Sequence, residues 1–498
     1  MGKGVVLDLY TDEPAGLGVP PYLGTYPRYI AGIFNKQGHD VSYLTIDDFR
    51  YYYNYDCKVS EVKVSQKSNI KIRNLTFNKD KVGELLENAD VVAVSGGAHT
   101  SGKYLSALPG NLNEILDVFK QLNCEKILAG PMASEFGSSY VGGKHVKMKD
   151  ISIFDKLYFA KSIKDYSEIR ESALKGAFIV NQIPYPIVCE IETSNGCPRD
   201  NGCSFCTEPL KGKPVFREQV DIIEEVKELV KLGMTRFRLG KQTCFYSYKG
   251  GEPEEIERLL KPLHELNLEM LHIDNVNPAN VVSKNGRKIT EMIVKYCTEG
   301  NVAAFGIESF DPVVIRENNL NTSPEMAFEA VKILNEIGGE VGENGMPKYL
   351  PGINILLGLK GENRETLEMN LEALKKIYDA GYMVRRINIR QVVPYHGTLL
   401  HETSGDKFIK KNKKRYYSFR KKVREQVDNP MLERVVPRGR ILKGVFTEVW
   451  DGKKTFGRQF GSYPLIVGIE QRLDLDKFID VRVKGYMLRS IIGEKVNE

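Results

Sequence analysis

The stretch ETSNGCPRDNGCSFC, residues 192–206, decides how the rest of the chain is interpreted. It brings three cysteines within ten residues of one another: Cys197, Cys203 and Cys206. The loop between the first two is rich in Pro, Asp, Asn and Gly, which favour turns. Three converging thiolates suit a four-iron cluster with one iron left open for a small molecule to chelate. A zinc loop is the alternative, but zinc needs a fourth ligand, and the nearest histidines, His145 and His264, lie far away in the sequence.

The cysteine loop resembles the hallmark of the radical S-adenosylmethionine (SAM) superfamily. Members carry three closely spaced cysteines after the first strand of a partial barrel, with an aromatic residue just before the last one. Phe205 occupies that aromatic position. The five residues between Cys197 and Cys203 exceed the usual spacing, whereas the Cys-x-x-Cys half is intact. The resemblance implies that the three cysteines hold a [4Fe–4S] cluster whose open iron binds SAM.

The composition is that of a large globular enzyme. A length of 498 residues predicts two or three domains, and 42% hydrophobic residues is ordinary. No apolar run approaches the roughly 20 residues that span a bilayer, and the N-terminus lacks a signal-peptide pattern. The eight cysteines do not form a disulfide scaffold, which favours a reducing compartment. We therefore expect a cytoplasmic protein with no membrane partner; the net charge of +6 does not by itself indicate nucleic acid.

Residues 1–180 are expected to form a Rossmann-like, doubly wound α/β domain. Buried strands are predicted at residues 5–9, 41–44, 91–95 and 127–130, and helices at residues 22–37 and 113–122. Gly38 is a good stop for the first helix. Residues 51–78 are predicted to be an inserted polar hairpin. Ligands of such folds bind at the carboxyl ends of the strands.

Small residues at these strand ends are similar to those of the cobalamin-binding domains that precede many radical SAM barrels. The relevant loops are residues 95–98 and 129–133, and residues 20–41 extend the likeness. Small residues let a flat macrocycle approach the backbone. A cleft walled by residues 16–22, 96–100 and 130–134 is therefore predicted. The Asp-x-His-x-x-Gly motif of some cobalamin proteins is absent, so cobalamin would receive no His ligand from the protein. A domain without a cofactor is the open alternative.

The three-part layout is also similar to that of methylthiotransferases, whose N-terminal domain holds a second cluster through three cysteines. The corresponding loops of this chain lack cysteine. The remaining Cys57, Cys124 and Cys189 are widely spaced, and each is expected to be a free, buried thiol. No second cluster is predicted.

Residues 181–402 are expected to form a partial (β/α)6 radical SAM barrel. Strands are predicted at residues 187–191, 236–240, 272–276, 303–309 and 352–358, with a sixth beginning at residue 387. Residues 220–232 show the apolar periodicity of an amphipathic helix. Repeated strand–helix units predict a parallel barrel whose site lies at the carboxyl ends of its strands.

Residues at those strand ends resemble the SAM contacts of the superfamily. The residues implied as cofactor-binding are Gly240, Gln242, Asn275, Asn277, Glu308, Ser309 and Gly358. The resemblance assigns Gln242 to the SAM amino group, the two asparagines to the methionine moiety or the substrate, and Glu308 with Ser309 to the ribose or carboxylate. Residues 358–362 and 394–398 resemble two further family motifs, the first passing close to adenine. A structural turn is the alternative at each position taken singly.

Three further residues follow the second barrel strand. Cys244 is either a thiol that faces the substrate or a packed thiol, and the second is favoured. Tyr246 and Tyr248 either donate a hydrogen atom or stack on a base, or are exposed loop residues.

The C-terminal part divides into a basic helical linker, residues 403–436, and a small β-barrel module, residues 437–498. Nine basic side chains crowd one stretch: Lys410, Lys411, Lys413, Lys414, Arg415, Arg420, Lys421, Lys422 and Arg424. Interleaved Tyr416, Tyr417 and Phe419 could stack on bases or pack onto the barrel. The module resembles the RNA-binding β domain of methylthiotransferases and is expected beside the mouth of the barrel; a lid over the radical site is the alternative.

The resemblance implies a radical SAM enzyme. Reductive cleavage of SAM, with an electron from a reduced donor, would generate a 5′-deoxyadenosyl radical that abstracts hydrogen from an unactivated carbon. With a cobalamin-binding-like domain, methyl transfer to a macromolecular substrate, RNA among the candidates, is the first hypothesis. A methylthiotransferase-like RNA-modifying enzyme and a non-catalytic metal- or RNA-binding protein are the alternatives.

Overall fold

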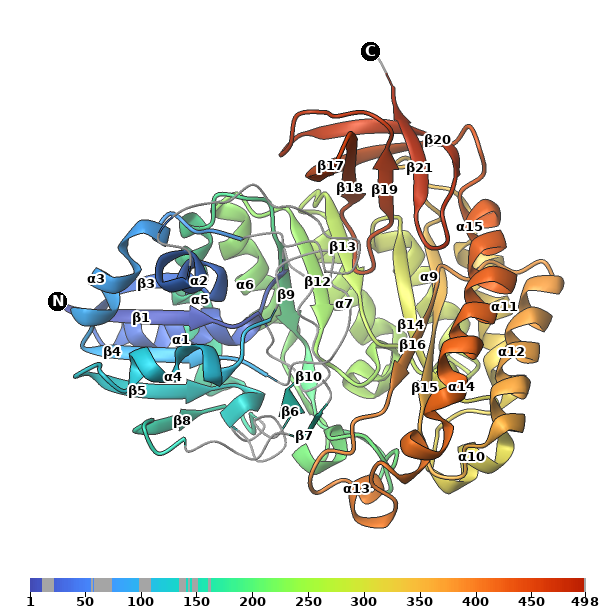
Figure 1. The fold of residues 1–498 in the computed structure, drawn as a ribbon, viewed down its shortest axis with the longest axis horizontal. Helices are drawn as coiled ribbons and strands as arrows, with labels where there is room; N and C mark the ends of the chain where they lie inside the picture. The colour runs from blue at the N-terminus through green and yellow to red at the C-terminus, as the bar shows by residue number, and fades with distance from the viewer. Residues whose placement is uncertain are drawn as a thin grey trace. The chain divides into compact units, whose positions relative to one another are not determined.

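The computed structural model describes residues 1–10, 22–54, 57, 74–97, 109–133, 140–141, 144–145, 151–159 and 163–496. These residues form two compact units, whose helices and strands are labelled in Figure 1. Unit 1 comprises Met1–Asn195 and Val215–Phe237. Unit 2 comprises Gly196–Pro214 and Arg238–Glu498, and it therefore contains the cysteine loop.

A parallel five-stranded sheet forms the centre of unit 1, in the order β3-β1-β4-β5-β8. Its strands are β1 (Gly2–Asp8), β3 (His39–Thr45), β4 (Val91–Ser95), β5 (Glu125–Ala129) and the short β8 (Lys156–Tyr158). All the strands predicted for this region are present. Because β1 pairs with β3 on one side and with β4 on the other, the strand order reverses there, as in doubly wound folds. The predicted fold class is confirmed.

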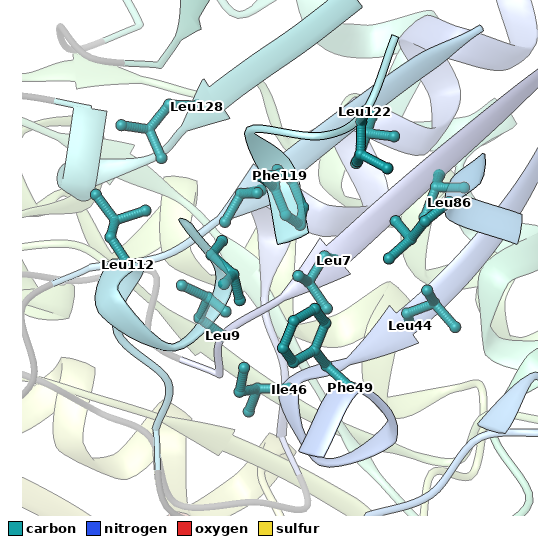
Figure 2. Close-up of a cluster of buried hydrophobic side chains, with 14 of the residues drawn as sticks. Leu7, Leu9, Leu44, Ile46, Phe49, Leu86, Leu112, Phe119, Leu122 and Leu128 are labelled. Atoms are coloured by element: carbon teal, nitrogen blue, oxygen red, sulfur yellow. The ribbon is translucent and has the colours of Figure 1, made fainter. Parts of the chain in front are cut away.

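Helices cover both faces of this sheet. On one face, α2 (Ile46–Asn54), α3 (Val82–Glu87) and α4 (Leu112–Phe119) contribute to an apolar core. Figure 2 shows part of it, with Leu7 of β1 and Leu9, which follows that strand, among side chains from α2, α3 and α4. On the other face lies α1 (Thr25–Lys36): a Cβ on Gly4 would come within 3.0 Å of the Phe34 ring.

The predicted boundaries of these helices are close to the observed ones. Helix α1 ends just before Gly38, whose φ of +88° terminates it. Helix α4 starts one residue early, because Asn111 and Glu114 form a capping box, and it ends at Phe119. The inserted hairpin was placed too early, since α2 continues to Asn54. Most of that insertion, residues 58–73, lies outside the described residues.

A buried ionic network joins the remaining elements of unit 1. Arg28 of α1 and Arg217 both bind the Glu225 carboxylate of α6 (Gln219–Lys231), at 2.9 and 2.5 Å. Arg28 also donates to the carbonyls of Leu23, at 3.1 Å, and Gly24, at 2.9 Å. All three charged side chains are fully buried. Both guanidinium groups are therefore paired with the same carboxylate.

Unit 2 contains the later strands of the predicted barrel, in alternation with helices. The strands are β12 (Arg236–Gly240, where the unit begins), β13 (Met270–Ile273), β14 (Asn301–Glu308), β15 (Tyr349–Leu357) and β16 (Arg386–Gln391). The first predicted strand is β9 (Val188–Glu192) of unit 1. The intervening helices include α7 (Pro253–His264), α9 (Gly286–Tyr296), α11 (Pro324–Gly338) and α12 (Arg364–Asp379). Strands β14, β15 and β16 are parallel, so their carboxyl ends share one edge.

The C-terminal part of unit 2 is a helical segment followed by a closed β-barrel. The helices are α14 (Lys407–Val423), a π-helical turn (Arg424–Asp428) and α15 (Asn429–Val435). The terminal barrel has the order β17-β18-β19-β21-β20, with β17 (Ile441–Asp451), β18 (Lys454–Gln459), β19 (Ile466–Ile469), β20 (Phe478–Tyr486) and β21 (Ile491–Lys495). The prediction of a small β-barrel module is confirmed. None of the helices in the described ranges has the length and apolar character needed to cross a membrane.

The terminal barrel lies at the amino ends of the unit 2 strands, so the prediction that it lies beside the barrel mouth was wrong. Lys443 N–H donates to the carbonyl of Asn344, which precedes β15, at 3.0 Å. Arg385, which precedes β16, donates to the carbonyl of Tyr463 at 2.8 Å. The cysteine loop, by contrast, bonds to residues that follow β14 and β16. The reason is α14, whose 17 residues carry the chain about 25 Å from one end of the strands to the other.

Candidate active site

The first cysteine is fixed by a backbone turn that only glycine fits well. Gly196 has φ +86°, and a Cβ there would lie 2.6 Å from the Lys213 carbonyl oxygen. The next residue, Cys197, donates its backbone N–H to the Gly212 carbonyl at 3.0 Å. The two ends of the loop are thus held against each other before any metal binds.

The second half of the loop is held by one buried amide. Ser204 donates its N–H to the Asn318 carbonyl at 2.9 Å, and its hydroxyl to Asn318 Oδ1 at 2.7 Å. Asn318 is fully buried and also donates to the carbonyls of Val314 and Lys360, each at 2.8 Å. Leu400 N–H donates to the Ser204 carbonyl at 2.7 Å. The loop between Cys203 and Cys206 is therefore anchored to segments that follow β14, β15 and β16.

An apolar cluster supports the same half of the loop. Cys203 and Phe205 pack against a buried cluster whose members come from the carboxyl-end loops: Val314, Leu320, Leu359, Val392 and Leu400. Phe205, the aromatic residue singled out in the sequence, is thus a packing residue that seats the loop on unit 2.

The three thiols are close enough to influence one another, and burial keeps two of them protonated. Burial raises the pKa of the Cys203 and Cys206 thiols, and the neighbouring cysteines add to this. Arg199 Nη1 lies 3.3 Å from the Cys203 sulfur. Iron binding would displace the protons, because thiolate is the ligating form.

The donor set fits a cluster in its chemistry, with three thiols on one anchored loop. Within the described ranges, no three Cys, His, Asp or Glu side chains are gathered around a point where they could hold a metal ion. A [4Fe–4S] cluster makes a different demand, since each thiolate binds a different iron. Of the two histidines considered as a fourth zinc ligand, His264 uses Nδ1 for a 3.1 Å contact with the Tyr296 carbonyl, and the side chain of His145 lies outside the described part.

Gln242 and Asn275 lie together at the ends of β12 and β13. Gln242 Nε2 donates to the Asp274 carbonyl at 2.6 Å, and Asn275 Nδ2 donates to the Gln242 carbonyl at 2.9 Å. Asn275 has φ +52°, a conformation that is unusual outside glycine. Gly240, the last residue of β12, is buried. Two residues predicted from separate motifs are thereby brought into contact.

Asn277 and Ser309 have structural tasks. Asn277 Oδ1 accepts from Ala279 N–H at 3.0 Å and caps α8 (Pro278–Val281). Ser309 Oγ donates to Asn370 of α12 at 3.4 Å and accepts from Asp311 N–H at 3.1 Å. Both side chains already have partners in the fold.

Glu308 acts electrostatically on the Cys203 thiol, as Glu208 does on the Cys206 thiol. It ends β14 with φ +65°, after a register shift in the β14–β15 pairing. Burial raises its pKa to about 8, an effect that Arg390 partly offsets. Its charge is felt at the Cys203 thiol. A carboxyl that is half-buried and mostly protonated at neutral pH can donate a hydrogen bond as well as accept one.

Gly358 and Glu362 join the end of β15 to the basic helix. Gly358 has φ +93°, and a Cβ there would lie 2.2 Å from Ile409 of α14. Its N–H donates to Glu362 Oε2 at 2.9 Å, while Asn412 of α14 donates to Glu362 Oε1 at 3.2 Å. Burial raises the pKa of Glu362 to about 7. Sequence reasoning noticed this motif but not its link to α14.

The three residues after β12 are buried. Cys244 is a packed thiol whose sulfur accepts from Asn277 N–H at 3.3 Å, as favoured from the sequence. Tyr246 and Tyr248 are each only 1% exposed, so the alternative of exposed loop tyrosines was wrong. Tyr246 shares a 2.8 Å hydrogen bond with Thr290 of α9.

In unit 1, one observation at the described strand ends favours the predicted cofactor cleft, and the packing around two glycines opposes it. Ser95 Oγ, at the end of β4 where the strand order reverses, is buried and has no hydrogen-bond partner in the part of the chain that the structure describes. Beside it, however, a Cβ on Gly96 would meet Leu9 and Met132 at 3.1 Å, and one on Gly130 would meet Tyr26 at 3.2 Å. Residues 16–21, 98–100 and 134 of the predicted walls lie outside the described residues.

Part of the chain matches a known protein family, and the chain is similar to several known proteins. Residues 191–374 match the model of the radical SAM superfamily. An uncharacterized protein of Methanocaldococcus jannaschii is 46% identical, covering 100% of this chain and 94% of its own. The ribosomal protein uS12 methylthiotransferase RimO of Carboxydothermus hydrogenoformans is 23% identical over 83% of this chain and 92% of its own. The radical SAM methyltransferase TsrM of Kitasatospora setae, solved with cobalamin and a [4Fe–4S] cluster, aligns with a TM-score of 0.49 and 13% identity over 80% of this chain and 74% of TsrM.

Residues 191–374 of the chain form a radical SAM domain. Such a domain implies a [4Fe–4S] cluster and SAM as cofactors, which confirms those two predictions. Two residues that hold the cysteine loop, Ser204 and Asn318, were not found by sequence reasoning. The two are 114 residues apart, and neither lies in a recognisable motif.

Proposed function

We propose that the protein is a radical SAM enzyme whose [4Fe–4S] cluster is held by Cys197, Cys203 and Cys206, and that it methylates an unactivated carbon of a macromolecular substrate. The observation that carries the proposal is the anchored loop, in which thiols in electrostatic contact lie within reach of Glu308. When bound, the cluster and SAM supply a carbon radical that abstracts hydrogen. The residues of the chain then have to bind SAM, orient it and exclude water.

Several predicted residues suit the binding of SAM in different ways. Gln242 and Asn275, which contact each other, would receive the polar methionine end, and Glu308 would hydrogen-bond the ribose or carboxylate. Gly358 and Gly240 contribute backbone close to the site. Asn277 and Ser309 would act by holding α8 and the β14 end in place. Glu308→Gln retains a donor and an acceptor, whereas Glu308→Ala retains neither, so SAM binding measured by equilibrium dialysis should fall far more in the second variant.

Methyl transfer is the finer part of the proposal, with cobalamin as the methyl donor. What supports it is the doubly wound sheet of unit 1 and the unpartnered Ser95 hydroxyl at its topological switch point. Binding of hydroxocobalamin to the metal-free protein, followed by its visible absorption, tests this directly. Saturable binding that Ser95→Leu weakens supports the site; no binding by the wild type leaves unit 1 without this cofactor and removes the methyl donor.

RNA is the substrate class favoured by the charge on α14. Its basic residues from Lys410 to Lys422 are all exposed, whereas Arg424 is buried and donates to the Ile387 carbonyl at 2.7 Å. Tyr416 and Phe419 pack inward and Tyr417 is 75% exposed, so one aromatic side chain remains for stacking. Because α14 runs beside the strands from the cysteine-loop end to the terminal barrel, RNA bound along it would pass the open end of the site (Figure 1).

Charge reversal tests the RNA proposal. Reversing Lys410, Lys411, Lys413 and Lys414 should lower RNA affinity and reduce the salt dependence of binding by up to about 3 in log–log slope. A control reverses four exposed basic residues elsewhere in unit 2: Arg258, Lys284, Arg287 and Lys288. If wild-type protein shows no salt-dependent RNA binding, the RNA proposal fails and a protein substrate takes its place.

A methylthiotransferase is the second candidate, favoured by the similarity to RimO over most of the chain. Such enzymes need a second cluster, yet the three cysteines differ in burial. Cys189 is buried and Cys124 is half-buried, whereas Cys57 is exposed, so the expectation that each is a buried thiol was wrong for Cys57. Replacing these three by Ala should leave the iron content unchanged. Loss of about half the iron would favour this candidate over the methyltransferase.

A further inference from the structure

One face of the β15–β16 pair is polar and partly open, although the strands are otherwise buried. Along β16 and the carboxyl-terminal half of β15, buried residues such as Ile353 and Ile387 alternate with half-buried ones. The half-buried polar residues are Asn354, Arg386, Asn388 and Arg390. Asn388 Nδ2 donates to Asn354 Oδ1 at 3.1 Å, and Arg386 Nη2 approaches Asn388 Oδ1 at 3.4 Å. Amide groups and guanidiniums therefore share one face.

Arg386 has no acidic partner among the described residues. Its guanidinium lies 4.3 Å from the centre of the Tyr463 ring, in the loop between β18 and β19 of the terminal barrel. The Tyr463 hydroxyl donates to Asp274 Oδ1 at 2.7 Å, but the other oxygen of Asp274 pairs with Arg238 at 3.3 Å. The nearest carboxylate in this network is thus committed to another arginine.

Three more arginines gather at the same end of the strands, and Asp428 is the carboxylate that acts on them in the part of the chain that the structure describes. Arg385 donates to the Tyr463 carbonyl, and Arg424 pairs with Asp428 across the π-helical turn. Arg489 occupies the β20–β21 turn, where its charge acts on Arg385 and Arg386. π-Helical turns are rare and often mark functional sites. Four guanidiniums thus surround a single acid, Asp428.

Burial and the excess of positive charge in this group of arginines lower the pKa of two of its members. Burial, together with the surrounding guanidiniums, lowers the pKa of both Arg385 and Arg386 to about 10. In unit 1, by contrast, Arg28 and Arg217 share the carboxylate of Glu225, and their pKa values are raised. Arg28 and Arg217 therefore show how buried arginines with a structural role are paired with a carboxylate. Arg385 and Arg386, for which the described residues provide no ion pair, need a different explanation.

We propose that Arg386, with Asn354, Asn388 and the arginines around it, binds an oxyanion of the substrate, either a phosphate or a carboxylate. The planar guanidinium matches both groups through paired hydrogen bonds, and the amides supply further donors. This inference rests on the proposed function, because it concerns the substrate of the same site: that substrate would carry a phosphate or a carboxylate.

The strand geometry relates this subsite to the cysteine loop. Arg386 and Arg390 lie on the same face of β16 and are four residues, or roughly 13 Å, apart. Arg390 interacts electrostatically with Glu308, which in turn acts on Cys203. The oxyanion would therefore bind deeper in unit 2 than SAM, with the target carbon of a compact substrate unit, such as one nucleotide, pointing back towards the cysteine loop.

Direct binding of simple anions tests the subsite. Inorganic phosphate and acetate are titrated separately into the full-length protein at constant ionic strength, with isothermal calorimetry for both and phosphorus NMR for the first. We expect saturable binding of one anion per chain, weakened about tenfold or more by Arg386→Gln and less by Arg386→Lys. Tighter phosphate indicates a phosphorylated substrate, and tighter acetate a carboxylate. Arg258→Gln, an exposed arginine on α7, is the matched control.

Two results would overturn the proposal. One is the absence of saturable binding of either anion to the wild-type protein. The other is equal binding to the wild type and to a folded Arg386→Gln or Arg386→Lys variant. Neither measurement depends on SAM cleavage, so a failure of this subsite is distinguishable from a failure of the proposed function, which iron content and 5′-deoxyadenosine formation report separately.

Discussion

The two ends of the parallel strands in unit 2 differ in charge and in how they are held. At the carboxyl end lie thiols and carboxyl groups whose pKa values are raised by burial, Cys203, Glu308 and Glu362 among them, and the loop there is anchored by neutral amides. At the amino end, the terminal barrel closes over arginines that outnumber their acidic partners. From this difference we infer that iron and SAM bind at the carboxyl end, and that an anionic group of the substrate binds at the amino end.

The largest effect on the free energy of unfolding is expected from a change at Asp274, which forms an ion pair with the buried Arg238. Asp274→Asn removes the carboxylate that Arg238 contacts at 3.3 Å, in a pair whose side chains are each only 2% exposed. Removing one partner of a buried pair costs about 3–5 kcal/mol. Arg386→Gln, which removes an unpaired charge, should change the free energy of unfolding by less than about 1 kcal/mol or stabilise the protein. Urea unfolding of both variants makes the comparison, and equal losses would show that Arg386 is a structural residue.

At the carboxyl end, Asn318→Ala should loosen the cysteine loop. It removes the amide that holds Ser204, Val314 and Lys360, and leaves several buried polar groups unpaired, at a cost of about 2–4 kcal/mol. Because the loop loses its anchor, iron retained per folded chain should fall several-fold after anaerobic reconstitution.

A matched asparagine provides the control for that effect. Asn335 of α11 makes similar bonds, donating to Val331 and accepting from and donating to Met383, but it does not touch the loop. Asn335→Ala should lower stability while retaining full iron. Loss of iron in both variants would mean that Asn318 acts only through overall stability.

The pH dependence of the metal-free protein should reveal the protonated carboxyl at this end. Glu308 has a pKa of about 8 in the folded chain and about 4.3 when unfolded. The stability linked to its proton is therefore fully present at low pH and is lost as pH rises through that interval. Between pH 6 and 7.5, the wild type should lose up to about 2 kcal/mol relative to Glu308→Gln. Parallel stability curves for the two proteins would contradict the assignment.

The features that could be predicted from the sequence are those that short local patterns encode. The strands of both units follow from short apolar runs such as residues 91–95, and the cysteine loop from its turn residues and spacing. The seating of Phe205 and the positive φ of Gly358 likewise belong to recognisable motifs.

What escaped prediction depends on contacts between distant residues. Ser204 meets Asn318 only because the strands are folded, and no periodicity marks either residue. The side on which the terminal barrel docks is decided by bonds such as Lys443 to Asn344, while the sequence shows only a helix of sufficient length before it. Arg424 belonged to a basic run, yet its side chain turns inward because the π-helical turn shifts its direction.

Cofactor chemistry at the cysteine loop tests whether Cys197, Cys203 and Cys206 hold a cluster that cleaves SAM. Wild-type protein, reconstituted anaerobically, should contain about four irons per chain and form 5′-deoxyadenosine from SAM under a strong reductant. Cys203→Ala should abolish both, whereas Cys124→Ala, outside the loop, should retain both. Wild-type protein that binds zinc but no iron, or a Cys203→Ala variant that still cleaves SAM, would contradict the account.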